Sequence, residues 1–374
     1  MGSNAVWDAF LEEFRHFGGR AENVIQRQGP LGLGLFPIDP NQPIELMVPE
    51  PLLVPADNVE LRNGDAVIRD DSFFPEGYAD WFRRYQATYS WGAEGEASVS
   101  RFETGLQQLP EPLRQSLQRL NLYQPEQRLP GTDWRDNMLR RFLNSRCLGR
   151  QGRLLVMPIV ELVNHAPSAA NWETRPNGGV GISGLRQGEI LVKYSNADPL
   201  RRLMGYGFNA PEPMAFSLKV HLQHRGQPVL VQGGGGRHWF QPTGVEQQKE
   251  RLIVHQPLLG FRKGPKLPKS LFLVACQGLN NVEPMELFEQ INRANTLELV
   301  NLLHQLDAVA GETADQLRNG CLDQLEALSH HVGHRQDVLN AESAMSEPLH
   351  PLQEPPLGMG QSADQSLNFH GFRR

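Results

Sequence analysis

The chain has 374 residues, of which 39% are hydrophobic and 21% are charged, an ordinary composition for a soluble globular protein with room for two or three compact units. Its formal net charge is −6 and it contains no long basic block, so nucleic-acid binding is not favoured. The three cysteines, Cys147, Cys276 and Cys321, form no CxxC pair, which argues against a zinc knuckle and against a disulfide framework.

The sequence predicts neither secretion nor insertion into a membrane. The first residues lack the basic start and apolar run of a signal peptide, and no stretch approaches the ~18 apolar residues of a membrane span. Together with the cysteine usage, this predicts a cytoplasmic protein with no membrane partner and no nucleic-acid partner.

The elements expected in the first part of the chain are a helix followed by extended segments. Apolar residues at helical spacing predict a lead-in helix within residues 1–19, which Gly18 and Gly19 end. Residues 32–36 and 44–49 then read as two short strands that form a hairpin around a turn at residues 39–41.

Helical and extended patterns alternate along the rest of the chain, which predicts an α+β fold. Helical spacing dominates residues 74–149, with proline and glycine breaks. Further extended segments are expected at 154–163, 180–182, 189–194 and 216–222, and three amphipathic helices at 270–279, 283–306 and 313–332. The segment 342–374 is rich in Ser, Pro, Gln and Gly and is expected to be a disordered tail.

The run between residues 157 and 208 carries the motifs that indicate a function. Asn164 and His165 close an apolar segment, Tyr194 ends a later apolar strand, and Tyr206-Gly207-Phe208 follows. With the Ser145-Arg146 pair and the glycine-rich residues 29–36 upstream, this order resembles a SET domain. The helical stretch between its two halves resembles the subgroup typified by the Rubisco large-subunit methyltransferases and the actin histidine methyltransferase.

The resemblance implies a SET-type fold of small β-sheets with a knot-like C-terminal half. On this basis the lead-in helix covers 1–19, and the SET domain covers 20–215 as two pieces, 20–73 and 150–215, around a helical insert at 74–149. A mostly helical, substrate-binding-like domain covers 216–341. The implied activity is methyl transfer from S-adenosyl-L-methionine to a protein substrate, with lysine preferred over histidine, by an enzyme expected to be a monomer.

Site residues are assigned by the same resemblance. Tyr206 orients the nucleophile and Tyr194 forms a channel wall as the second catalytic residue, while Phe208 and Phe216 line the substrate channel. The residues implied to bind the cofactor are Gly32, Leu33, Gly34, Arg146, Glu161, Asn164, His165 and Tyr206. These types suit the cofactor, because a guanidinium pairs with its carboxylate and close backbone, amide and imidazole groups can line the rest.

Some features depart from the family pattern or allow another interpretation. Glu161 stands where the subgroup commonly has Asp, and Ala166 follows the Asn-His pair where Ser is common. A SET-like scaffold that binds a partner without turnover therefore remains an alternative to an enzyme.

Two further motifs have competing explanations. The glycines at 233–236 could cradle a phosphate but precede no convincing helix, which favours a simple loop. His330, His331 and His334 have spacing compatible with a metal, but histidines also suit the C-terminal end of a helix, and no metal is expected.

Overall fold

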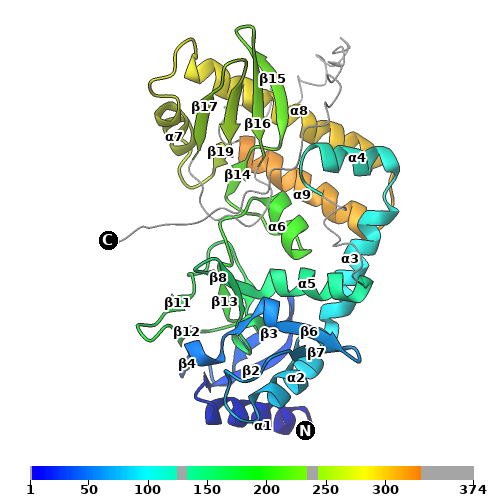
Figure 1. Cartoon of the computed structure of the whole chain (residues 1–374), viewed down its shortest axis with the longest axis vertical. Helices are drawn as coiled ribbons and strands as arrows, with labels where there is room; N and C mark the ends of the chain where they lie inside the picture. Colours follow the sequence, from blue (N-terminus) through cyan, green and yellow to red (C-terminus); the bar gives the residue numbers. More distant parts are fainter. Residues whose placement is uncertain (1, 124–132, 234–242, 330–374) are drawn as a thin grey trace. The chain divides into compact units, whose positions relative to one another are not determined.

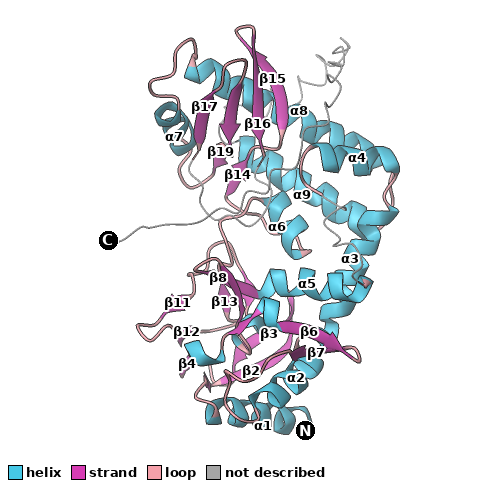
Figure 2. Cartoon of the chain, in the orientation of Figure 1, coloured by secondary structure: helices cyan, strands magenta, loops and turns pink. Residues whose placement is uncertain are grey.

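Helices alternate with small β-sheets of two to four strands in the computed structural model, which describes residues 2–123, 133–233 and 243–329 (Figures 1 and 2). The predicted α+β class is confirmed. The interpretations placed on residues 234–236, on His330, His331 and His334, and on the tail 342–374 lie outside the described residues.

The N-terminal helix α1 (Gly2–His16) is amphipathic. Its buried face includes Trp7, Phe10, Leu11 and Phe14, which pack into the first hydrophobic core. Arg15 and His16 lie in its last turn, where basic side chains favour the negative end of the helix dipole. The lead-in helix expected from the sequence is confirmed.

The first strands pair differently from the expected hairpin. Strand β3 (Gly32–Pro37) pairs with the preceding β2 (Val24–Gly29), whereas β4 (Pro43–Val48) pairs with β1 (Arg20–Glu22) and β12 (Val180–Leu185). The predicted pairing between 32–36 and 44–49 is therefore wrong. The two-residue turn between Gly29 and Gly32 closes a tighter hairpin, and Gly32 adopts φ +94°, which favours glycine.

The remaining strands described before residue 199 are short and make small sheets. They are β5 (Val54–Pro55), β6 (Val59–Arg62), β7 (Asp65–Ile68), β8 (Cys147–Arg150), β9 (Arg153–Val156), β10 (Asn164–His165), β11 (Glu173–Thr174) and β13 (Leu191–Val192). Strands β10 and β13 run parallel and place Asn164 opposite Leu191, so the Asn-His pair and the segment that leads to Tyr194 are neighbours.

The described part of residues 74–149 contains four α-helices, and helical spacing in the sequence predicts helices there. They are α2 (Tyr78–Tyr89), α3 (Glu96–Gln108), α4 (Glu111–Arg119) and α5 (Trp134–Arg146). They contribute to two hydrophobic cores. The first contains α2 and α5 side chains such as Trp81 and Phe142, and the second contains α3 and α4 side chains such as Leu106 and Leu117.

The second core is built mainly from residues after position 199. It includes α6 (Pro199–Tyr206) and three later helices, α7 (Leu267–Ala275), α8 (Pro284–Asp307) and α9 (Glu312–Ser329). The three helices expected from the sequence are confirmed, with shifted ends, but α7 is apolar on both faces and so is not amphipathic.

Among the sheets that these helices cover, the sequence predicts only one extended segment, at residues 216–222. These sheets comprise β14 (Met214–Phe216), β15 (Val220–His224), β16 (Gln227–Gln232), β17 (Gly244–Gln247), β18 (Leu252–His255) and β19 (Leu258–Phe261). The order β15-β16-β18-β17 makes a four-stranded sheet, and β14 pairs with β19. Helix α8 contacts β15, and α9 contacts β14 and β19.

Across the described residues, no helix is both long enough and apolar enough to span a bilayer.

Candidate functional site

The Asn164-His165 pair follows a tight turn and does not end an apolar strand. Strand β9 stops at Val156, and residues Val160–Leu162 form one turn of 3-10 helix. Ile159 before it has φ +67°, an uncommon value for a β-branched residue, and its backbone N–H donates to the Tyr85 hydroxyl. The predicted strand over 154–163 is therefore wrong in its second part.

Tyr206 is the last residue of α6 and does not belong to an isolated turn. Asp198 caps the start of this helix by accepting a hydrogen bond from the Arg201 backbone, and Gly207 ends it with φ +79°. That left-handed conformation favours glycine after a helix. The short helix fixes the direction of the Tyr206 side chain.

Four of the predicted site residues form one aromatic cluster. The rings of Tyr194 and Tyr206 are 5.6 Å apart between centroids, and Phe208 lies 6.4 Å from Tyr194 and 6.1 Å from Tyr206. His165 is 5.1 Å from Tyr194. These are distances at which aromatic rings attract one another. The fold thus brings together residues that are up to 43 positions apart, the separation of His165 and Phe208 (208 − 165).

The His165 side chain belongs to a buried charged group. Its Nε2 lies 2.8 Å from Glu212 Oε1, and Glu212 pairs with Arg202 at 2.7 Å, with all three side chains fully buried. His165 Nδ1 accepts a hydrogen bond from the Tyr194 backbone N–H, so Nδ1 carries no proton and Nε2–H donates to Glu212. Burial lowers the pKa of His165, in keeping with this neutral ring.

Arg202 connects this group to Tyr206. Its guanidinium carbon lies 4.5 Å from the centre of the Tyr206 ring, within the range of a cation–π contact. No sequence motif indicates a role for Arg202 or Glu212. Only their burial as an ion pair in the folded chain shows that they belong to this group.

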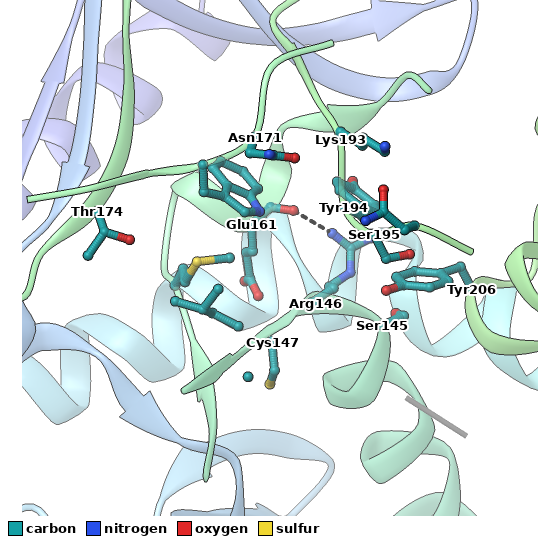
Figure 3. Close-up of a pocket in the computed structure, with 15 residues that line it drawn as sticks. Ser145, Arg146, Cys147, Glu161, Asn171, Thr174, Lys193, Tyr194, Ser195 and Tyr206 are labelled. Carbon is teal, nitrogen blue, oxygen red and sulfur yellow. Dashed lines mark hydrogen bonds between the residues drawn. The ribbon is translucent and has the colours of Figure 1, made fainter. Parts of the chain in front are cut away.

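A cavity of about 310 Å³ opens beside Tyr206 and Tyr194 (Figure 3). Small-molecule sites usually have volumes of about 300–1,000 Å³. The lining residues are 145–149 and 193–196, with Met157, Glu161, Asn171, Trp172, Thr174 and Tyr206. Of the predicted site residues, the cavity therefore includes Arg146, Glu161, Tyr194 and Tyr206.

Three polar groups of this cavity are buried without a hydrogen-bond partner in the described residues. They are Arg146 Nε, Glu161 Oε2 and Ser195 Oγ. The Arg146 guanidinium does donate to the Glu161 backbone carbonyl at 3.2 Å, the contact drawn in Figure 3. No described carboxylate lies within ion-pair distance of Arg146. Buried polar groups are usually satisfied, so water or a polar ligand in the cavity would complete the hydrogen bonds of these three.

Glu161 is fixed from its other side by the helical insert. Its Oε1 accepts hydrogen bonds from Tyr85 (3.0 Å), Gln86 (2.8 Å) and Ser90 (2.8 Å). Burial raises the pKa of Glu161, while the nearby Arg146 and these donors oppose the rise. The three donors were not predicted as site residues, because only the packing of α2 on residues 157–163 brings them here.

The glycine-rich hairpin and Asn164 lie together, outside the cavity lining. Asn164 Nδ2 donates to the Leu33 carbonyl (3.1 Å) and to Glu189 Oε1 (2.7 Å). A Cβ atom added to Gly34 would come within 2.3 Å of Glu189 Oε1 and 2.7 Å of Asn164 Nδ2. A larger residue at 34 would therefore force the Glu189 and Asn164 side chains to shift. Cofactor binding by the hairpin and the Asn-His pair stays a prediction for Gly32, Leu33, Gly34, Asn164 and His165.

The two predicted channel phenylalanines occupy different surroundings. Phe208 belongs to the aromatic cluster, whereas the Phe216 ring lies under the Arg201 guanidinium at 4.8 Å. A second, small cavity of about 20 Å³ touches Tyr206 and is lined by α3, α5 and residues 205–207. Tyr206 and Ser145 line both cavities.

Comparisons with known proteins give structural likeness only. No protein-family model and no curated protein matches the sequence. The chain is similar to a crystal structure of the SET domain of LSMT bound to lysine and AdoHcy, with 13% identity, 92% of this chain and 93% of that chain covered, and a TM-score of 0.45. It is also similar to a structure of Rubisco LSMT bound to AdoMet, with 12% identity, 90% and 93% covered, and a TM-score of 0.40.

Proposed function

We propose that this chain is an S-adenosyl-L-methionine-dependent protein methyltransferase that acts on a lysine side chain. One observation carries the proposal. Arg146, Glu161 and Tyr206 line a single cavity, where the guanidinium has no carboxylate partner among the described residues and one carboxylate oxygen has no donor. The order of the sequence motifs that resembles a SET domain supports the same assignment.

The residues present fit the amino-acid end of the cofactor. That end is a zwitterion, so it needs a cation for its carboxylate and an acceptor for its ammonium group. The Arg146 guanidinium suits the carboxylate, and Glu161 Oε2 is the acceptor left over after Oε1 is satisfied. Ser195 Oγ, also unpartnered, adds a neutral donor.

The reaction needs positioning more than covalent chemistry from the protein. When bound, the cofactor supplies an electrophilic methyl group on a sulfonium. Tyr206 borders both cavities, which supports the proposal that its hydroxyl orients an incoming amine beside that group. The neighbouring Tyr194 hydroxyl donates to the Val163 carbonyl at 2.6 Å, and burial raises the pKa of Tyr194 to about 12, so this phenol acts as a neutral wall.

A lysine substrate must lose a proton before it reacts. Desolvation among Tyr194, Tyr206 and Phe208 disfavours an ammonium and lowers the pKa of a lysine that enters.

Cofactor binding is tested by titration calorimetry with S-adenosylhomocysteine. We expect saturable binding that Arg146→Ala weakens by about tenfold or more, because a buried charged hydrogen bond is lost. Arg153→Ala is the matched control, since Arg153 is exposed on β9 and is not among the lining residues. Absence of binding to the unaltered protein would remove the cofactor assignment.

Turnover is tested with methyl-labelled S-adenosylmethionine in a cell extract depleted of small molecules. We expect label in protein, recovered as methyl-lysine after acid hydrolysis, and a loss of about a hundredfold or more with Tyr206→Phe at unchanged S-adenosylhomocysteine affinity. Label recovered as methylhistidine would show that the target side chain is histidine and not lysine. Cofactor binding without any transfer would favour the scaffold alternative.

A further inference from the structure

Helix α7 is apolar on both of its faces. Pro268 and Phe272 are buried on the inner face, while Leu267, Leu271 and Val274 are 42%, 41% and 61% exposed. These three follow i, i+4, i+7 spacing and form one stripe on the outer face. A surface helix normally carries polar residues on that side.

The exposed apolar residues are concentrated on this helix. Leu273 is also 42% exposed, so α7 carries four of the ten large hydrophobic residues that are exposed in the described chain. Single exposed hydrophobic residues are normal, whereas a contiguous group marks an interaction site. The helix contacts β17, β19 and α8, and Figure 1 draws it beside β17.

Basic residues precede this apolar stripe in the chain. Residues 251–282 contain five Lys or Arg residues and no Asp or Glu, although the whole chain has a net charge of −6. Lys263 and Lys266, just before α7, are exposed and form no ion pair with any described residue. Lys269 pairs with Glu289 at 2.9 Å.

We propose that the α7 surface, defined as Leu267, Leu271 and Val274 with Lys263 and Lys266, docks an acidic amphipathic helix of a partner protein. The stripe is about 10 Å long at 1.5 Å per residue, so it matches two turns of a helix with apolar side chains at the same spacing. Because both lysines precede the stripe, acidic residues are expected at one end of the partner's apolar face. If the proposed function holds, the partner is the methylated protein; the docking itself does not depend on that activity.

Two other occupants suit this surface less well. A symmetric dimer would place the same patch on both sides, so Lys263 and Lys266 would meet no acidic partner within it. An anionic bilayer would attract Lys263 and Lys266, but membrane-binding surfaces usually cluster about four to eight basic residues, and this surface has only these two. An acidic helix satisfies both the charge and the apolar spacing.

The probe is a fluorescent amphipathic peptide about 18 residues long with leucines at i, i+4 and i+7 and glutamates at one end of the stripe. We expect binding by fluorescence anisotropy that weakens at least about fivefold between about 50 and 300 mM salt, because exposed charges are screened. Leu271→Ser should weaken it about tenfold, as should the pair Lys263→Glu and Lys266→Glu. The doubly altered protein should instead prefer a peptide with lysines in place of the glutamates.

The matched control is Leu322→Ser, which removes a leucine that is 50% exposed on α9 and should leave binding unchanged. No cofactor is present, so failure of methyl transfer does not affect the result. The proposal is overturned if the acidic peptide does not bind, or if Leu271→Ser binds it equally well. It is also overturned if Leu271→Ser instead abolishes binding to phosphatidylserine vesicles or dissociates a dimer in sedimentation.

Discussion

The buried group of His165, Glu212 and Arg202 gives the sharpest test of how this structure is held together. We consider Glu212→Gln, which keeps the shape of the side chain and removes its charge. Arg202 is fully buried, and Glu212 is its one ion-pair partner among the described residues. The substitution therefore leaves a buried guanidinium without a counter-charge.

The expected magnitude follows from that isolation. Removal of one partner from a buried ion pair typically costs about 3–5 kcal/mol, whereas replacement of both partners by uncharged residues costs much less. Glu212→Gln should thus lower the free energy of unfolding by about 3–5 kcal/mol, and addition of Arg202→Met should restore at least about 2 kcal/mol of it. The Arg202 hydrogen bond to the Ser195 carbonyl, at 3.1 Å, is too weak to replace the lost charge.

Urea unfolding followed by tryptophan fluorescence measures both values from the midpoint and the slope. Glu286→Gln is the control, since Glu286 pairs with Arg225 on the surface, where both side chains are about half exposed and the pair is worth about 0–1 kcal/mol. A loss of less than about 1 kcal/mol for Glu212→Gln, or a double variant no more stable than the single one, would refute the reasoning.

Three further outcomes are expected. Cys147 lines the cavity while the two other cysteines are buried, so iodoacetamide should label Cys147 first and S-adenosylhomocysteine should slow that labelling; equal rates with and without the ligand, read by mass spectrometry, would contradict its binding there. Tyr194→Phe removes the hydrogen bond to the Val163 carbonyl and should lower the free energy of unfolding by about 1 kcal/mol, measured in urea, and no change would show that the bond contributes nothing. Because burial lowers the pKa of His165 in the folded chain, the unfolded chain takes up its proton first, and stability should fall as the pH drops below about 6.5 towards the folded value; His165→Gln should show a smaller loss between pH 7.5 and 5.5, and an equal loss would exclude His165 as the cause.

Periodicity and local composition determined the helices and the turn residues of this protein. The apolar spacing in α1, α8 and α9 predicts helices because a single amphipathic face is enough to specify them. Gly207 after Tyr206 likewise signals a chain reversal, since glycine tolerates the left-handed conformation. The motif order also brought Tyr194, Tyr206, Phe208 and His165 to attention before any distance between them was known.

Long-range pairing was decided only by the tertiary structure. Strand β4 selects β12, more than a hundred residues later, instead of its neighbour β3. Strand pairing depends on which buried faces meet, and that information is spread over the whole chain.

The chemistry of the site was likewise decided only by the tertiary structure. Glu161 keeps one unpartnered oxygen because α2 saturates the other, and Arg202 and Glu212 face each other because α6 and the following loop pack behind His165. The sequence supplies these residue types and their order, but burial and the distances between their polar atoms arise only when the elements pack, and those two quantities set charge, hydrogen bonding and reactivity.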